Sequence, residues 1–214
     1  MKFVLLTGFI LFGVFTQANA QDNPPHSLLS KTVPSFSLPN IFGEMISPDN
    51  FQNAKGFVVV FTCNHCPFAK LYSHRLNALQ RTYAKRGVFV LAINSMDTSV
   101  YDDEGLGMMQ QRAKTEKFIF NYLRDASQSV ARRFGATHTP QAFIIWKEDD
   151  KWIIKYCGAI DNNGQEPSKA TAFVANALND LLADRKVVMP ESESIGCAIN
   201  FRETAASAIR TKER

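Results

Sequence analysis

Two cysteines separated by two residues are the chain's clearest candidates for chemistry. Cys63 and Cys66 follow the apolar run 57–61 and come just before Pro67. Such a pair can be half of a zinc site, a haem anchor, a structural disulfide or a redox centre. Haem attachment needs a histidine where Pro67 stands, and zinc usually needs a second cysteine pair or two histidines at short spacing. A disulfide closing so short a loop adds little stability, so the pattern favours a redox centre without metal or cofactor.

The cysteines occupy a predicted junction between a buried strand and an amphipathic helix. Run 57–61 is apolar and β-branched, as in a strand buried on both faces. From Pro67, apolar residues recur every three or four positions up to Gly87, which suits a helix stop. These apolar residues are Phe68, Leu71, Tyr72, Leu76, Leu79 and Tyr83.

A thiolate just ahead of a helix meets unpaired amides and the positive end of the helix dipole, and both lower its pKa. We therefore expect Cys63 to be the exposed nucleophile and Cys66 to be the shielded thiol that resolves the mixed disulfide. Between them lie Asn64 and His65. Protonated His65 would favour the thiolate further; alternatively, His65 is a solvated turn residue.

The other elements follow from the same periodicities, with a polar loop from Asn94 to about Lys117 that has room for a short helix. We expect strands over 88–93, 118–123, 142–146 and 151–157, and helices over 127–134 and from a cap at Ser168 to 182. A strand-helix-strand unit followed by a helix, a hairpin and a closing helix predicts a mixed α/β sandwich with a parallel section and an antiparallel edge, which is the thioredoxin order.

The N-terminal residues have the pattern of a targeting signal. Lys2, the apolar run 3–15 and the small-x-small stretch 18–20 are typical of a secretory signal peptide. The alternative, a membrane anchor, would need about 20 apolar residues. We expect a signal peptide over 1–20, one domain over 21–202, a flexible tail over 203–214, and a secreted or periplasmic protein. The balance of 24 basic against 20 acidic residues offers no basic stripe for nucleic acid.

Several motifs in order carry a resemblance to a known family. They are Cys63 to Pro67, then 91–95, Thr139-Pro140, 158–161 and 194–197. Together they resemble the peroxiredoxin-like branch of the thioredoxin superfamily, the redoxin or AhpC/TSA-type domains, from about Val33 to Phe201. The resemblance implies an N-terminal β-hairpin around Phe36 to Ile46, an insertion over 95–125, and a cis Thr139-Pro140 bond against the cysteine pair.

The same resemblance implies roles around the Thr-Pro segment. Thr139 would offer its backbone to an extended substrate, and Pro140 would keep a competing amide away from the sulfurs. His138 stands where relatives often have cysteine, and we count it with the substrate-binding residues. Thioredoxins have an acid six positions before the first cysteine; Phe57 stands there, so the resemblance supplies no proton route.

Three functions are compatible with this site. The preferred one is thiol-disulfide exchange with protein disulfide or dithiol substrates, with an electron-donating partner that would be the only link to a membrane. The alternative is an antioxidant thiol peroxidase, but its Pro-x-x-x-Thr/Ser-x-x-Cys motif is missing, since Gly56 and Val60 precede Cys63 at those spacings. The third is copper binding, in which His138 would join the two thiolates.

Two further cysteines remain, Cys157 and Cys197. The base rate for free cysteine favours a small buried thiol at both positions. If the chain after the closing helix returns to the Thr139-Pro140 side, Cys197 becomes an accessory third thiol. If it returns to the last strand, Cys197 could instead pair with Cys157.

Overall fold

A six-stranded mixed sheet forms the centre of the molecule in the computed structural model, which describes residues 28–203. The predicted signal peptide and residues 204–214 of the predicted tail lie outside the described residues. The strand order is β1-β9-β8-β4-β5-β6, in which β4, β5 and β6 are parallel and β8, β9 and β1 are antiparallel to their neighbours. The bounds are β1 Thr32–Val33, β4 Gly56–Phe61, β5 Val88–Asn94, β6 Asn121–Arg124, β8 Gln141–Glu148 and β9 Lys151–Gly158.

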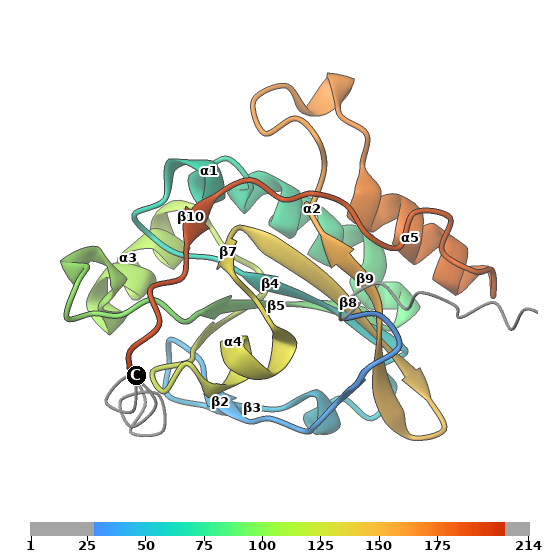
Figure 1. The fold of residues 1–214 in the computed structure, drawn as a ribbon, viewed down its shortest axis with the longest axis horizontal. Helices are drawn as coiled ribbons and strands as arrows, with labels where there is room; N and C mark the ends of the chain where they lie inside the picture. The colour runs from blue at the N-terminus through green and yellow to red at the C-terminus, as the bar shows by residue number, and fades with distance from the viewer. Residues whose placement is uncertain (1–27, 204–214) are drawn as a thin grey trace, which may run out of the picture.

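The sheet is covered on both faces, as Figure 1 shows. On one face lie α1 (Pro67–Lys70), α2 (Ser73–Tyr83) and α5 (Phe173–Leu182); on the other lie α4 (Ser129–Phe134) and the hairpin of β2 (Leu38–Pro39) and β3 (Met45–Ile46). Helix α3 (Leu106–Thr115) packs beside β6. Short 3₁₀ turns lie at Pro48–Asn50, Ala84–Arg86, Asp102–Glu104 and Pro167–Lys169. None of the helices in the described part is long and apolar enough to cross a membrane.

The central strand β4 shows why this sequence makes two cores. Its residues alternate between the faces, so Phe57, Val59 and Phe61 join the core under α4, while Val58 and Val60 join the core under α2 and α5. All five are at most 1% exposed. A run that is apolar at every position therefore belongs in a strand covered on both sides.

Most predicted elements are present, including the N-terminal hairpin and the insertion, but three details were wrong. The helix after Pro67 is two helices, because the amides of Leu71 and Tyr72 bond to carbonyls three residues back and interrupt the regular α-helical pattern. The strand predicted over 118–123 begins only at Asn121. Ser168 does not cap the closing helix; it lies in a 3₁₀ turn, and Ala170 then adopts extended backbone, so α5 begins at Phe173.

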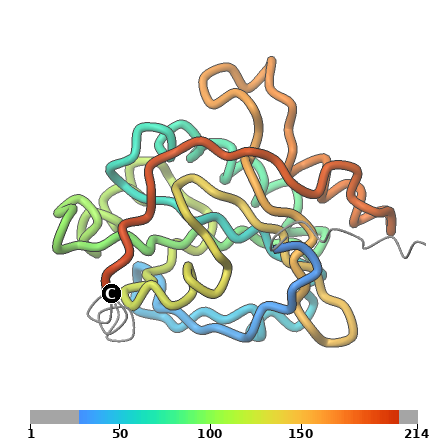
Figure 2. The backbone as a smooth tube through the Cα atoms, viewed as in Figure 1, coloured from blue at the N-terminus to red at the C-terminus, as the bar shows by residue number. Residues whose placement is uncertain are grey.

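Two short strands bring the chemistry together at one end of the sheet. Strand β7 (His138–Thr139) leads into a cis Thr139–Pro140 bond, as predicted. Strand β10 (Cys197–Ala198) pairs antiparallel with β7, with Cys197 opposite Thr139. Figure 2 shows the C-terminal segment crossing the molecule from the end of α5 to this place. The C-terminal segment thus meets the cis-proline segment beside the cysteine pair.

Candidate redox site

The cysteine pair lies where β4 gives way to α1. Cys66 is the N-cap residue of α1 and Pro67 its first residue, as the sequence predicted. Both cysteines are free and 0% exposed. The expectation that Cys63 is exposed was therefore wrong: its sulfur lies 2.9 Å from the Thr139 hydroxyl, and Glu104 of the insertion lies beside the same turn.

The pKa values of the two cysteines shift in opposite directions, because each thiol acts on the other. The Cys63 thiol donates to the Cys66 sulfur, and this contact, supported by the Cys197 thiol and the Ala69 amide, lowers the pKa of Cys66 to about 4 although burial opposes the shift. The same contact, burial and the charge of Glu104 raise the pKa of Cys63. The low pKa predicted for Cys63 thus lies at Cys66, chiefly because of the Cys63 contact and to a smaller extent because the Ala69 amide of α1 also acts on Cys66. At a pH between the pKa values of Cys66 and Cys63, the pair holds one proton and one negative charge.

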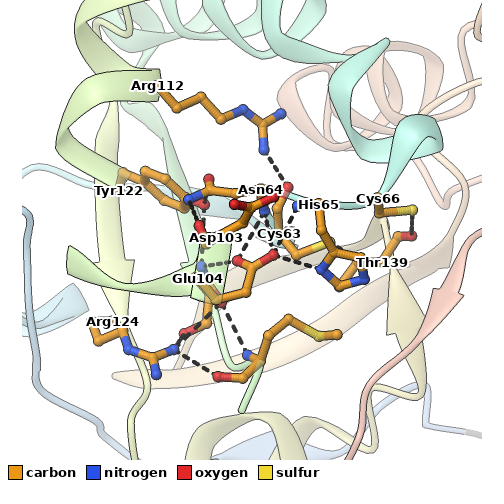
Figure 3. Close-up of polar contacts among 12 residues, drawn as sticks. Cys63, Asn64, His65, Cys66, Asp103, Glu104, Arg112, Tyr122, Arg124 and Thr139 are labelled. Carbon is orange, nitrogen blue, oxygen red and sulfur yellow. Dashed lines mark hydrogen bonds and ion pairs between the residues drawn. The ribbon is translucent and has the colours of Figure 1, made fainter. Parts of the chain in front are cut away.

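A buried carboxylate holds the turn between the cysteines. Glu104 is 0% exposed and comes from the 3₁₀ turn before α3. It accepts hydrogen bonds from the backbone amides of Asn64 (2.9 Å) and His65 (2.8 Å), and from the side chain of Asn94 (2.6 Å). Figure 3 shows the carboxylate pointing into the turn. A buried charge needs such donors, so Glu104 and the turn stabilise each other.

Further side chains fix the turn from the insertion side. The Asn64 side chain donates to the Asp103 carbonyl (2.7 Å) and accepts from the Tyr122 hydroxyl (2.9 Å). Arg112 of α3 donates to the Cys63 carbonyl, as Figure 3 shows, and at 3.2 Å to the Ala69 carbonyl within α1. The planar guanidinium therefore bridges both ends of the segment that carries the pair.

His65 is a structured residue of this cluster. Its Nδ1 lies 2.6 Å from Glu104, and its ring stacks on Tyr101 at 4.0 Å. This contradicts the alternative of a merely solvated turn residue, while its influence on the thiolate stays a prediction. Within residues 28–203, Cys63, His65 and Glu104 are the group whose donor atoms, all within 4.8 Å, could hold a metal ion. The oxygens of Glu104 already accept several hydrogen bonds, which a metal would have to displace.

Thr139 lies against both sulfurs, but its strand edge is occupied. The Cys66 sulfur lies 3.3 Å from the Thr139 carbonyl oxygen, and the Thr139 hydroxyl contacts Cys63. Along the outer edge, β10 pairs with β7, and Ile199 donates to the Thr137 carbonyl at 2.9 Å. The extended substrate predicted to bind the Thr139 backbone would meet the protein's own C-terminal segment there.

Of the remaining predicted residues, His138 and Cys157 lie apart from the cysteine pair, whereas Cys197 contacts it. His138 bonds to Ser194 through Nε2 and to Thr137 through Nδ1, both at 2.7 Å, so both ring nitrogens are engaged away from the sulfurs and the copper arrangement is not assembled. Cys157 contacts Gln141 at 3.7 Å, and burial raises its pKa to about 11. Cys197, by contrast, joins the pair through Cys66.

Sequence reasoning missed Glu104 and Arg112. The only signal was that an acidic run, Asp102 to Glu104, stands in an insertion of a chain whose thioredoxin-type acid position holds Phe57. Nothing in the run itself shows that Glu104 is buried while its two neighbours are exposed.

Comparisons with known proteins agree with this fold. An uncharacterized conserved protein from Geobacillus kaustophilus is 32% identical with a TM-score of 0.75, over 83% of this chain and 94% of that one. A hypothetical protein from Sinorhizobium meliloti 1021 is 31% identical with a TM-score of 0.74, over 82% and 96%. Peroxidoxin BcpB from Mycobacterium tuberculosis shares the fold at 18% identity and a TM-score of 0.51, over 62% and 85%.

No curated protein matches the chain. The AhpC/TSA family model matches residues 29–156, which is more than half of the sequence and includes the cysteine pair, the Glu104 turn and the cis-proline segment. The thioredoxin-like fold with its N-terminal hairpin and insertion is the one that the sequence resemblance implied. The chain therefore belongs to the AhpC/TSA family.

Proposed function

We propose that this protein is an exported thiol-disulfide oxidoreductase, in which Cys63 and Cys66 alternate between dithiol and disulfide during exchange with protein substrates. The observation that carries the proposal is a pair of free cysteines at the start of α1, with both sulfurs against Thr139 of the cis Thr139–Pro140 bond. A lowered thiol pKa makes a thiolate available at neutral pH, and the thiolate is the reactive form.

The exchange needs no other reactant than the substrate disulfide. A proton first moves from Cys63 to Cys66. The Cys63 thiolate then attacks one sulfur of the substrate disulfide, and the second substrate sulfur leaves as a thiolate that takes up a proton. Thr139 and the Cys66 amide stabilise the charge on Cys63. Cys66 then loses its proton and attacks Cys63, which forms the Cys63–Cys66 disulfide and releases the second substrate thiol.

The surface beside the pair supports a protein substrate. Phe68, Leu71 and Ile195 are 45%, 41% and 69% exposed, respectively. With Pro140 they line a pocket of about 350 Å³. Exposed apolar side chains gathered in a concave site are typical of contacts with apolar groups of a partner. A substrate side chain can bind here although β10 occupies the Thr139 edge.

Export and the electron donor rest on the sequence. Residues 1–20 have the composition of a cleaved signal peptide, and a protein that turns over disulfides in an oxidising compartment needs a partner to return its pair to the dithiol form.

The test is reduction of insulin with dithiothreitol as the electron source. We expect Cys63→Ser to abolish the catalysed rate and Cys66→Ser to abolish turnover while accumulating a mixed disulfide on Cys63. Cys157→Ser is the matched control, because Cys157 is a half-buried thiol held by Gln141, and it should keep the wild-type rate. Full turnover by Cys63→Ser would show the mechanism to be wrong.

The peroxidase alternative is separated by the same variants assayed with hydrogen peroxide. We expect the peroxide rate to be far below the disulfide rate, since Gly56 and Val60 stand at the peroxidase motif's proline and hydroxyl positions. A peroxide rate that exceeds the insulin rate and depends on Cys63 would replace our proposal with the peroxidase.

A further inference from the structure

The C-terminal strand β10 occupies the place of an extended ligand beside the cis-proline. Cys197 lies opposite Thr139 in the antiparallel register, and Ser194, three residues earlier, is held by His138 at 2.7 Å. The approach is close: a Cβ atom added to Gly196 would lie 1.9 Å from the Thr139 carbonyl oxygen. Glycine is thus what lets this backbone pass directly over Thr139.

Three sulfurs gather around Thr139 as a result. Cys63 contacts its hydroxyl at 2.9 Å, and Cys66 contacts its carbonyl oxygen at 3.3 Å. Cys197 reaches this place from β10: it packs against the buried cluster that contains Cys63 and Cys66, and it lowers the pKa of Cys66. Cys66 therefore has a sulfur neighbour on either side, Cys63 within its own turn and Cys197 on β10.

We propose that Cys197 is a third redox-active thiol, which takes over the disulfide from the buried pair by forming a Cys66–Cys197 bond; this rests on the proposed function of the pair. The Cys197 thiolate attacks the Cys66 sulfur of the Cys63–Cys66 disulfide. The Cys66–Cys197 bond forms, the Cys63–Cys66 bond breaks, and Cys63 leaves with the electron pair as a thiolate beside the Thr139 hydroxyl. Cys63 takes up the proton that Cys197 released, so the exchange leaves the oxidation level unchanged.

The exchange would move the disulfide from two buried sulfurs to a more accessible one. Cys63 and Cys66 are both 0% exposed, whereas Cys197 is half-buried on the outer strand. An electron-donating protein has to reach a disulfide sulfur to reduce it. Moving the disulfide to Cys197 presents such a sulfur at the edge of the molecule. Burial and the contact with Cys66 raise the pKa of Cys197 to about 11, and the second of these causes disappears once Cys66 is oxidised.

Disulfide mapping of the Cys63→Ser variant tests the contact directly. The purified protein is oxidised with diamide, alkylated, and digested without reduction. We expect an intramolecular Cys66–Cys197 disulfide that forms at a rate independent of protein concentration, both in Cys63→Ser and in the Cys63→Ser/Cys157→Ser control. A free Cys197 beside intermolecular Cys66–Cys66 dimers would overturn the proposal.

Cys197→Ser tests the use of the thiol in turnover. We expect diamide to form the Cys63–Cys66 disulfide as in wild type, whereas re-reduction by a protein dithiol such as thioredoxin slows by about tenfold or more, because the disulfide stays buried. Cys157→Ser should re-reduce at the wild-type rate. Unchanged re-reduction of Cys197→Ser would refute the proposal and leave the function of the pair standing, since a Cys63–Cys66 disulfide and insulin reduction would both persist.

Discussion

The negative charge of Glu104 acts on single sulfur atoms. It lies beside the turn between the cysteines and raises the pKa of Cys63, in addition to the larger effects of the Cys66 contact and burial. At the same time its oxygens accept the amides that hold the turn in place. Glu104 therefore stabilises the turn between the cysteines and disfavours the thiolate form of Cys63.

Glu104→Gln separates these two effects. The variant removes the charge, so we expect a lower pKa of Cys63 and a rate profile for disulfide exchange that moves to lower pH. The new side chain also carries an NH₂ group, which cannot accept the hydrogen bonds that Glu104 accepts from the turn. The free energy of unfolding should therefore fall by about 1–3 kcal/mol. Thiolate absorbance against pH measures the pKa of Cys63, and urea denaturation measures the free energy of unfolding.

Asp102→Asn is the matched control for Glu104→Gln. It removes one charge two residues away on an exposed side chain, and both properties should stay near wild type. A Cys63 pKa that rises or does not move in Glu104→Gln would contradict this account of the carboxylate.

At the scale of elements, strand β10 passes close to the backbone of Thr139 at Gly196. Gly196→Ala would place a methyl group within 1.9 Å of the Thr139 carbonyl oxygen, which belongs to backbone and cannot turn aside. We expect β10 to separate from β7, with a loss of about 1–3 kcal/mol in the free energy of unfolding. Cys197 should then react faster with iodoacetamide in the folded protein, and the pKa of Cys66 should rise as it loses a donor.

Gly107→Ala is the control at the element scale. An added Cβ at Gly107 meets no atom within 4 Å, so the alkylation rate of Cys197 should match wild type. If Cys197 in Gly196→Ala also reacted at the wild-type rate, β10 would not depend on this glycine.

The sequence predicts elements better than it predicts the contacts between them. Strand β4, the helices after Pro67 and the turn at Glu148 to Lys151 follow from local patterns of side chains, and they are present. The break at Tyr72 and the start of α5 at Phe173 depend on how each segment meets the sheet. The placements of Glu104 and Cys197 depend on residues 40 or more positions away, which no local pattern encodes.

At the scale of the whole molecule, the opposite pKa shifts of Cys63 and Cys66 make the free energy of unfolding depend on pH. Cys66 has a lowered pKa of about 4 against an ordinary 9.0, so its contribution is lost as pH falls through 4. Cys63 has a raised pKa, so its contribution is lost as pH rises beyond 9.0. Between about 4 and 9.0 the unfolded chain binds one more proton than the folded pair, and stability rises with pH by at most about 1.4 kcal/mol per unit.

Urea denaturation of the reduced protein across this pH range checks the linkage. The Cys63→Ser/Cys66→Ser variant carries the pH dependence of every other group, so the difference between the two proteins isolates the pair. We expect this difference to rise up to about pH 9 and to fall above it, following the ordinary thiol pKa of 9.0. A difference that is flat, or that falls between pH 5 and 8, would contradict the opposite pKa shifts of Cys63 and Cys66.

The most direct test of the central claim is a redox titration of the cysteine pair. The purified protein is equilibrated in glutathione buffers of stepped ratio, quenched with acid, alkylated and mapped without reduction. We predict one reversible two-electron transition in which Cys63 and Cys66 form a disulfide, joined at most by Cys66–Cys197 through exchange, while Cys157 stays a thiol throughout. Cys63 and Cys66 that remain thiols at every ratio, or that oxidise without return, would contradict a dithiol redox centre.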